Sequence, residues 1–177
     1  DDGGETNHEL PLWVAEPNAG ISPGQLWHYA KGTDNPPPDW NESSFDESDW
    51  DMEEAALGYG TQNLNTELVD MKDSYVSLYL RREFYIEDLG SLEHVNLSIL
   101  YDDGYVAYLN GTELSRANMP AGAPTADTLA SSDHVAVPPY LLSQAAISLN
   151  LVQGMNVLSI EVHNDVLGSS SFVAAPS

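Results

Sequence analysis

Apolar and polar side chains alternate along residues 74–87, which is the pattern of a β-strand with one buried face. The other face carries Tyr75, Ser77, Tyr79 and Glu83, together with Arg81. Arg82 interrupts the apolar face, so the pattern predicts either a β-bulge at this position or a buried acidic partner for it. The apolar face consists of Val76, Leu78, Leu80, Phe84 and Ile86.

The same two-residue period recurs in residues 95–101, 105–110 and 157–163. Asp-Gly and Asn-Gly pairs favour tight turns between strands, so Asp103-Gly104 and Asn110-Gly111 each predict a hairpin. No segment has the 3.6-residue period of a long amphipathic helix. Short strands separated by such turns predict an all-β protein, a sandwich or a barrel.

The chain divides into an extension and one domain. Residues 1–24 are rich in acids, Gly, Pro and Asn, with one apolar island at residues 10–14, and we interpret them as an extension or linker. The domain is predicted over residues 25–177, with its first strand at residues 27–29. Residues 31–50 contain a run of three prolines and predict a loop. Residues 46–54 predict one or two helical turns, capped by the serines before them.

Charge excludes several partner classes. The chain has 28 acidic and 5 basic residues among 177, so its formal net charge is −23. Such a charge repels phosphate, and five cations cannot replace the counterions that a nucleic acid releases. No apolar run approaches the roughly 20 residues that span a bilayer. We therefore expect neither nucleic acid nor a membrane as partner.

The absence of cysteine removes disulfides, thiolate metal sites and cysteine nucleophiles. Few lysines and a sequence pI near 4.1 fit a secreted bacterial protein in salty, for example marine, water, where ions screen the self-repulsion. An acidic surface kept for solubility explains the same composition. The start at Asp1 fits either a removed signal peptide or a module cut from a longer protein.

Several segments form an ordered set of motifs between residues 27 and 172. Phe45-Asp46-Glu47-Ser48-Asp49-Trp50 is followed by a Leu-Gly-Tyr-Gly run at residues 57–60, and Tyr-Leu-Arg-Arg occupies residues 79–82. Later segments are an Asp-Asp-Gly to Leu-Asn-Gly stretch at residues 102–111, Arg-Ala-Asn-Met-Pro at 116–120, and the stretch 154–164, which ends in Glu-Val-His-Asn.

In order and spacing these segments resemble the galactose-binding-domain-like jelly rolls, a group that includes the sugar-binding domain of family 2 glycoside hydrolases and many modules of secreted bacterial enzymes. The resemblance implies a jelly-roll β-sandwich and a non-catalytic accessory domain, often one that binds carbohydrate. It does not identify a ligand, because one fold hosts many functions. Residues 1–24 have no counterpart in the family.

Catalysis is not favoured by the residues themselves. Asp102-Asp103 is most simply a turn whose carboxylates accept backbone N–H groups. The chain has no Gly-x-Ser-x-Gly elbow, phosphate-binding glycine loop or His-Glu-x-x-His zinc helix. Its five histidines are scattered, without partners at ligand spacing. We therefore expect a protein that is not an enzyme, although Asp103 and His163 define a less favoured catalytic alternative.

A sugar site needs rigid aromatic surface together with planar hydrogen-bonding groups. Polar side chains at the ends of the predicted strands supply such groups if the strands pair as in the resembled fold. The alternative is a buried polar network that pins loops to the sandwich, with Arg81 or Arg82 paired to Asp102 or Asp103. The candidate ligand-binding residues are Tyr59, Arg81, Asp103, Arg116, Asn118, His163, Asn164 and Trp13.

Tryptophans and acids add two expectations. Trp27 and Trp50 are predicted core residues, and Trp13 is the best candidate for an exposed platform, or it anchors the extension. The acid-rich loop with Asp46 and Asp49 has the oxygen ligands that Ca²⁺ takes, without EF-hand spacing. We predict a structural calcium there as an alternative to a solvated acidic surface.

Together these observations predict a carbohydrate-binding module that holds a secreted polysaccharide-degrading enzyme, its parent catalytic domain, near a polysaccharide or oligosaccharide. The alternative is a structural domain that packs against the catalytic domain and binds no sugar. The net charge argues against sulfated glycans, whereas a local cluster of Arg81, Arg82 and Arg116 argues for them.

Overall fold

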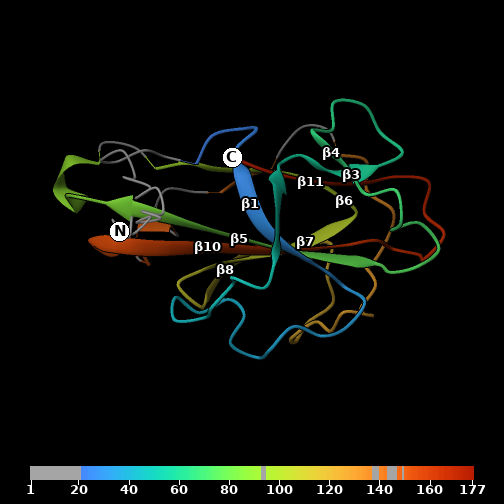
Figure 1. Cartoon of the computed structure of the whole chain (residues 1–177), viewed down its shortest axis with the longest axis horizontal. Coiled ribbons are helices and arrows are strands. Elements are labelled where there is room, and N and C mark those ends of the chain that lie inside the picture. Colours follow the sequence, from blue (N-terminus) through green and yellow to red (C-terminus); the bar gives the residue numbers. More distant parts are fainter. Residues whose placement is uncertain (1–20, 93–94, 137–139, 143–146, 149) are drawn as a thin grey trace, which may run out of the picture.

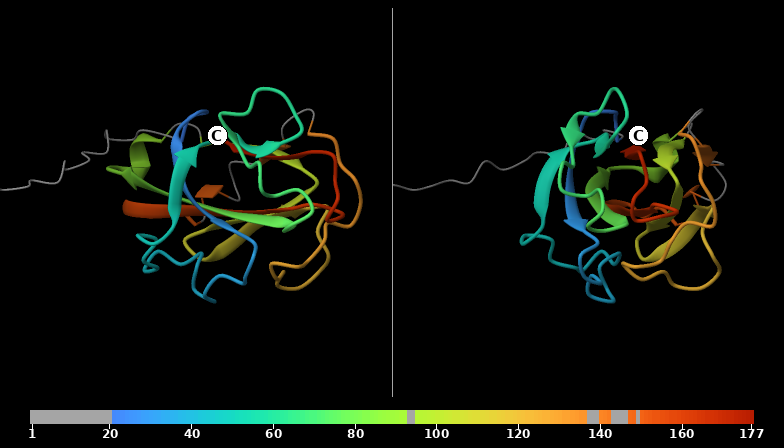
Figure 2. Two further views of the ribbon diagram at one scale, coloured as in Figure 1. Left: turned by 45° about the vertical axis from the view of Figure 1, so that its right-hand side comes forward. Right: turned by 90° about the vertical axis from the view of Figure 1, so that its right-hand side faces the viewer.

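The protein is a sandwich of two β-sheets, which confirms the predicted all-β jelly-roll fold (Figures 1 and 2). The structure is a computed structural model, and it describes residues 21–92, 95–136, 140–142, 147–148 and 150–177, with only the backbone of residues 140–142. Residues 1–20, which include Trp13, lie outside the described residues. Ile21, inside the predicted extension, packs against the core of the sandwich.

One sheet has six strands in the order β2-β1-β5-β10-β7-β8. The long strands β5 and β10 pair over ten consecutive residues, so β5 contains no bulge against β10 at Arg82. The strands of this sheet are β1 (Leu26–Lys31), β2 (Asp51–Glu54), β5 (Ser77–Ile86), β7 (Gly104–Leu109), β8 (Thr112–Ala117) and β10 (Gly154–His163).

The second sheet has five strands in the order β4-β3-β11-β6-β9. Its β3 and β4 are parallel neighbours, whereas its other pairs are antiparallel. A 3-10 turn, η1 (Leu89–Ser91), follows β5. The strands are β3 (Leu57–Tyr59), β4 (Thr66–Glu67), β6 (Leu97–Asp102), β9 (Tyr140–Leu142) and β11 (Phe172–Pro176).

The core lies between the sheets and follows the predicted alternation. Leu78 and Leu80 of β5 are buried beside Leu158, Ile160 and Val162 of β10. Phe84, at the end of the same face of β5, is partly buried against this cluster. Each fully buried aliphatic side chain contributes about 1.5–3 kcal/mol from the apolar surface it removes from water.

One of the two predicted hairpins is correct. Asn110 and Gly111 have positive φ angles of 50° and 81°, as the two-residue turn between β7 and β8 requires. The hairpin predicted at Asp103-Gly104 is wrong, because β6 and β7 belong to different sheets. This turn instead carries the chain from one layer of the sandwich to the other.

The helical turns predicted over residues 46–54 are also wrong at their C-terminal end. Residues 51–54 form β2, whose four residues pair with β1 at the edge of the sheet. All four β2 side chains are exposed, so no apolar periodicity marks this strand in the sequence. Pairing with β1, rather than local propensity, therefore decides its conformation.

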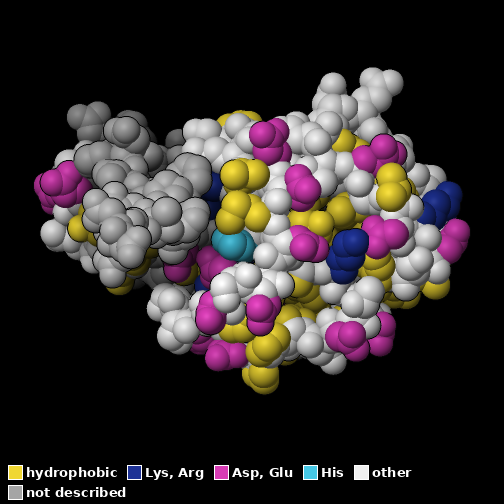
Figure 3. Space-filling model, viewed as in Figure 1, with side chains coloured by type: hydrophobic (Ala, Val, Ile, Leu, Met, Phe, Trp, Pro, Cys, Tyr) yellow, Lys and Arg dark blue, Asp and Glu magenta, His cyan; other side chains and the backbone are white. Residues whose placement is uncertain are grey.

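Acidic side chains are spread over the visible face of the molecule (Figure 3), in keeping with the net charge of −23. Among the residues that the structure describes, no helix has both the length and the apolar character needed to cross a bilayer.

Candidate functional site

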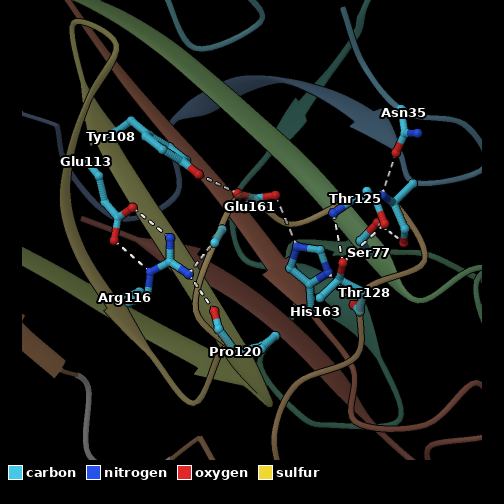
Figure 4. A network of polar contacts seen from close by, with 12 residues as sticks. Asn35, Ser77, Tyr108, Glu113, Arg116, Pro120, Thr125, Thr128, Glu161 and His163 are labelled. Atoms are coloured by element: carbon cyan, nitrogen blue, oxygen red, sulfur yellow. Dashed lines mark hydrogen bonds and ion pairs between the residues drawn. The ribbon is translucent and has the colours of Figure 1, made fainter. Parts of the chain in front are cut away.

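The polar face of β10 forms a buried chain of hydrogen bonds (Figure 4). The Tyr108 hydroxyl donates to Glu161 Oε1 at 2.6 Å, and His163 Nε2 lies 3.2 Å from Glu161 Oε2. His163 Nδ1 lies 2.8 Å from the Thr128 carbonyl oxygen. His163 is fully buried and Glu161 is 2% exposed, so these two side chains are closed to a ligand, whereas Tyr108 is partly buried.

Two loops cover this face of the six-stranded sheet. The loop over residues 119–133 lies on the β10 side, where the Ser77 hydroxyl donates to the Ala126 carbonyl at 2.8 Å. The Ala126 amide in turn donates to Asn35 Oδ1 at 2.7 Å, which ties this loop to the one over residues 32–50 (Figure 4). The polar network thus pins both loops to the sandwich.

Arg81, on β5, binds the loop over residues 32–50 to the sheet. Its guanidinium is fully buried and lies 2.6 Å from Glu47 Oε2, and it donates to the carbonyl oxygens of Trp40 and Glu42. It also lies 5.1 Å from the ring of Phe45, a cation–π contact. The predicted pairing of Arg81 with Asp102 or Asp103 is therefore wrong, because its carboxylate partner comes from this loop.

A second buried network surrounds the turn between the two sheets. Asp103 is fully buried, and its carboxylate accepts the amides of His134 at 2.7 Å and Asp165 at 2.8 Å. The Asn118 side chain donates to the Asp103 carbonyl at 3.1 Å, and it also donates to the Ser132 carbonyl. These bonds satisfy backbone groups of three separate segments.

Tyr59 and Asn164 belong to a third contact at the same end of the sandwich. Asn164 Nδ2 donates to the Tyr59 hydroxyl at 3.0 Å, and that hydroxyl donates to the Ser169 carbonyl at 3.1 Å. Asn164 is fully buried and Tyr59 is 6% exposed. Burial raises the pKa of the Tyr59 hydroxyl, which keeps it neutral and able to donate.

Burial also raises the pKa of the carboxyl groups at the turn. Desolvation is the main cause for Asp102, Asp103 and Asp165, and the charge of Asp103 adds to the shift at Asp165. The two amides that Asp103 accepts counteract its shift without cancelling it. Among the described residues, no group of three His, Cys, Asp or Glu side chains has the arrangement of a metal site.

The predicted ligand-binding residues that the structure describes thus do not form one open cleft. Arg81, Asp103, His163 and Asn164 are buried within internal networks, which favours the alternative of a loop-pinning network. Arg116 is partly exposed and pairs with Glu113 at 2.7 Å, and it donates to the Pro120 carbonyl at 2.6 Å (Figure 4).

The predictions for the tryptophans and for the acid-rich loop have mixed outcomes. Trp27 is a core residue, as predicted, whereas Trp50 is only partly buried and stacks on Trp40. Asp46 and Asp49 are exposed, and Asp46 accepts the Ser48 amide at 3.0 Å. The Ser48 side chain, and after it this amide, lowers the pKa of the Asp46 carboxyl group. Calcium binding by these two acids stays a prediction.

An open groove lies where β1 separates from β5. β1 pairs with β5 only through residues 28–31, whereas Leu26 and Trp27 pair with β2 alone. The guanidinium of Arg82 crosses the gap and donates to the Leu26 carbonyl. The groove has a volume of about 410 Å³, which is within the roughly 300–1,000 Å³ of small-molecule sites. We call it the strand-gap groove.

The strand-gap groove combines polar and apolar walls. Leu26, Met52 and Met155 are each more than two-fifths exposed, and they offer apolar surface to a ligand. Partial burial raises the pKa of the Glu83 carboxyl at the rim, and the neighbouring Glu47 adds to the shift. The described residues that line the groove are Gln25, Leu26, His28, Glu47, Met52, Arg81, Arg82, Glu83, Phe84 and Met155.

Sequence reasoning missed this groove, although one signal pointed to it. Arg82 breaks the apolar face of its strand, and the structure places it at the point where two strands part. Among the described residues, Arg82 has no buried acidic partner of the kind that the sequence predicted, and the hydrogen-bond acceptor of its guanidinium is the Leu26 carbonyl. A second cavity, of about 200 Å³, is apolar and lined mainly by core side chains such as Ile86, Leu109 and Leu158.

Solved structures share this fold. The chain is similar to a Bifidobacterium dentium β-glucuronidase complexed with coumarin-3-O-glucuronide (17% identity, TM-score 0.51), covering 79% of this chain and 19% of the other. A calcium-binding mutant of Bacteroides uniformis β-glucuronidase 2 matches at 16% identity and a TM-score of 0.53, over 86% and 17%. A glycosyl hydrolase family 2 member from Bacteroides cellulosilyticus matches at 11% identity and a TM-score of 0.53, and the match covers 88% of this chain and 20% of the other.

These likenesses show the fold alone, a β-sandwich that also occurs within these β-glucuronidases and this glycosyl hydrolase family 2 member. The chain spans about a fifth of the length of these enzymes. The sequence itself matches no protein-family model and no curated protein.

Proposed function

We propose that this domain is a non-catalytic carbohydrate-binding module, which holds a secreted polysaccharide-degrading enzyme near its glycan. The observation that carries the proposal is the strand-gap groove, which offers hydrogen-bonding side chains between apolar walls in a sandwich of this fold. A sugar presents the matching surface, because its ring has apolar C–H faces and a rim of hydroxyl groups.

The mechanism would be one of effective concentration. A bound module confines the linked catalytic domain to the volume around its substrate, so even a weak contact raises the rate of encounter. One groove of this size fits a dissociation constant on the order of 10⁻³ to 10⁻⁵ M. The proposed location of the parent enzyme is outside the cell, where polysaccharides occur.

Titration of the folded chain with a panel of plant and marine polysaccharides tests the proposal. We expect saturable binding of at least one polysaccharide. Met155→Glu should weaken it, because Met155 is 49% exposed in the groove wall and the change replaces its apolar surface with a charge. Val69→Glu is the matched control, since Val69 is 82% exposed and lies outside the groove. We expect no release of reducing sugar, and such release would contradict the non-catalytic proposal.

A second candidate function is an accessory domain that packs against a catalytic domain without binding sugar. The burial of Arg81, Asp103, His163 and Asn164 favours it, because these motif residues serve the fold itself. In that case the whole panel gives no binding, and Met155→Glu weakens association with the catalytic domain instead. That outcome would overturn the carbohydrate-binding proposal.

A further inference from the structure

Arg82 is the arginine in the strand-gap groove that has no acidic partner among the residues that the structure describes. Arg81 pairs with Glu47 and Arg116 pairs with Glu113. The structure gives Arg82 one acceptor, the neutral carbonyl of Leu26, and its Nε is closed off from water without any acceptor. Desolvation lowers the pKa of this guanidinium, and no carboxylate offsets that shift. A partly buried guanidinium without a carboxylate partner is stabilised more by a bound anion than a guanidinium that already has an ion pair.

His28 adds an unpartnered nitrogen to the same groove. It stands opposite Arg81 in the register of β1 and β5, on the outer face of the sheet. Its Nδ1 is closed off from water and has no hydrogen-bond partner within the described part of the chain. Native structures leave few buried polar groups unpaired, and a missing ligand or water is a common reason. Two such nitrogens, on His28 and Arg82, therefore line one groove.

The remaining groups in the groove limit the anion to a single charge. Arg81 is neutralised by Glu47 at 2.6 Å, so Arg82 supplies the unpaired positive charge. Glu83 at the rim opposes a second negative charge. Arg81, Arg82 and Arg116 therefore do not offer three free positive charges to a sulfated glycan, because Arg81 and Arg116 are paired with glutamates. One carboxylate on an otherwise neutral ring meets these requirements better than a densely sulfated chain.

We propose that the strand-gap groove binds an acidic sugar, with the carboxylate of a uronic acid residue on Arg82. This inference rests on the proposed function and names its ligand class. The carboxylate draws the guanidinium toward the groove and gives Nε the acceptor that it lacks. His28 takes a hydroxyl of the sugar, and Met52 and Met155 contact the C–H face of the ring.

Calorimetric titration with an oligogalacturonate and its methyl ester tests the inference, because esterification removes the negative charge of the carboxyl group and adds only a methyl group. We expect the free acid to bind about tenfold more tightly than the ester. Arg82→Gln should remove this preference by weakening the acid alone. Arg116→Gln is the matched control, since Arg116 lies outside the groove and should leave both affinities unchanged.

Glu83→Gln provides an independent variant with the opposite expected sign. It removes a negative charge from the rim, so the free acid should bind about threefold more tightly while the ester is unaffected. Because Glu83 lies at the rim and has no ion-pair partner among the described residues, this variant keeps the test decisive even if Arg82→Gln fails to fold.

The outcomes separate the two proposals. Equal binding of acid and ester, with neither charge variant changing the ratio, overturns the acidic-sugar inference and leaves carbohydrate binding intact. Binding of neutral oligosaccharides without binding of the acidic ligand also overturns the acidic-sugar inference and leaves carbohydrate binding intact. If neither these ligands nor any polysaccharide of the panel binds the folded chain, the proposed function fails together with the inference.

Discussion

Arg81 is the cation on which the loop over residues 32–50 depends. Its guanidinium is fully buried and bonded to Glu47, which is 12% exposed, and to two loop carbonyls. Removing one partner of a buried ion pair leaves the other charge uncompensated, at a cost of about 3–5 kcal/mol. We therefore expect Arg81→Met to lower the free energy of unfolding by about this amount, as measured by urea denaturation.

Arg116 offers the matched control for that measurement. It pairs with Glu113 at the same 2.7 Å that separates Arg81 Nε from Glu47, but its side chain is 24% exposed and Glu113 is 39% exposed. Arg116→Met should cost less than about 1 kcal/mol, as exposed pairs do. Equal losses in the two variants would contradict the assigned role of Arg81.

His163 is expected to serve stability rather than sugar binding. His163→Ala leaves the Thr128 carbonyl and the Glu161 carboxyl without the imidazole, both in a region closed to water. We expect a loss of about 2–4 kcal/mol in the free energy of unfolding, since each orphaned buried group costs about 1–3 kcal/mol. The affinity of the folded fraction for the best glycan of the panel should not change; a selective loss of affinity would restore His163 to the ligand site.

At the residue scale, the sequence predicted correctly that certain polar residues lie close together. It did not predict that they are buried and hydrogen-bonded to loops. His163, Asn164 and Asp103 do lie near one another, since the amide of Asp103 donates to the His163 carbonyl and the amide of Asp165 donates to the Asp103 carboxylate. Their burial was not predictable, because it depends on loops over residues 32–50 and 119–133 that carry no periodic pattern.

At the element scale, two turns with the same local signal have different outcomes. Asn110-Gly111 joins neighbouring strands of one sheet, whereas Asp103-Gly104 joins strands of different sheets. The difference lies in partners distant in sequence: β6 pairs with β11 and β9, and β7 pairs with β10 and β8. Turn propensity reports only the local bend, so the sequence alone does not separate these cases.

Gly58 tests how tightly β3 packs against its neighbour β11 in the five-stranded sheet. A Cβ at this position would lie 2.0 Å from the carbonyl oxygen of Phe172 on β11, and backbone atoms cannot move away cheaply. We expect Gly58→Ala to cost about 1–3 kcal/mol, measured as a loss of unfolding free energy.

Gly90 is the matched control for Gly58. An added Cβ there meets only the Asp88 side chain, at 3.2 Å, on an exposed turn. Gly90→Ala should therefore change the free energy of unfolding by less than about 0.5 kcal/mol. A similar small change at Gly58 would mean that β3 and β11 separate readily.

At the scale of the whole molecule, the alternation of apolar residues was sufficient to predict an all-β sandwich or barrel, and the family resemblance selected the jelly-roll sandwich. The faces predicted for β5 and β10 are those that the structure shows, because one-sided burial leaves a two-residue period in the sequence. The strand-gap groove has no such signature. It lies where the first two residues of β1, Leu26 and Trp27, pair with β2 and not with β5.

The carboxyl groups of the whole chain set the expected response to pH. The pKa values of Glu83, Asp102, Asp103 and Asp165 are raised mainly by burial, so the folded chain binds their protons more tightly than the unfolded chain does. Their contribution to stability is therefore present at low pH and falls as pH rises above about 4. Asp46, Asp70 and Glu113 have lowered pKa values and act in the opposite sense, since their contribution is complete above about 4 and is lost below it.

We therefore expect the free energy of unfolding to be greatest near pH 4–5, roughly where both groups contribute, and lower at pH 7. The net charge of −23 acts in the same direction, because protonation of carboxylates relieves repulsion in the compact state. Added salt screens that repulsion, so about 1 M NaCl should raise the melting temperature at pH 7 more than at pH 4.5. Thermal denaturation over pH 3–8, at about 0.05 and 1 M NaCl, measures both effects. A maximum at or above pH 7 with no response to salt would show that the acidic surface is spaced widely enough to cost the fold nothing.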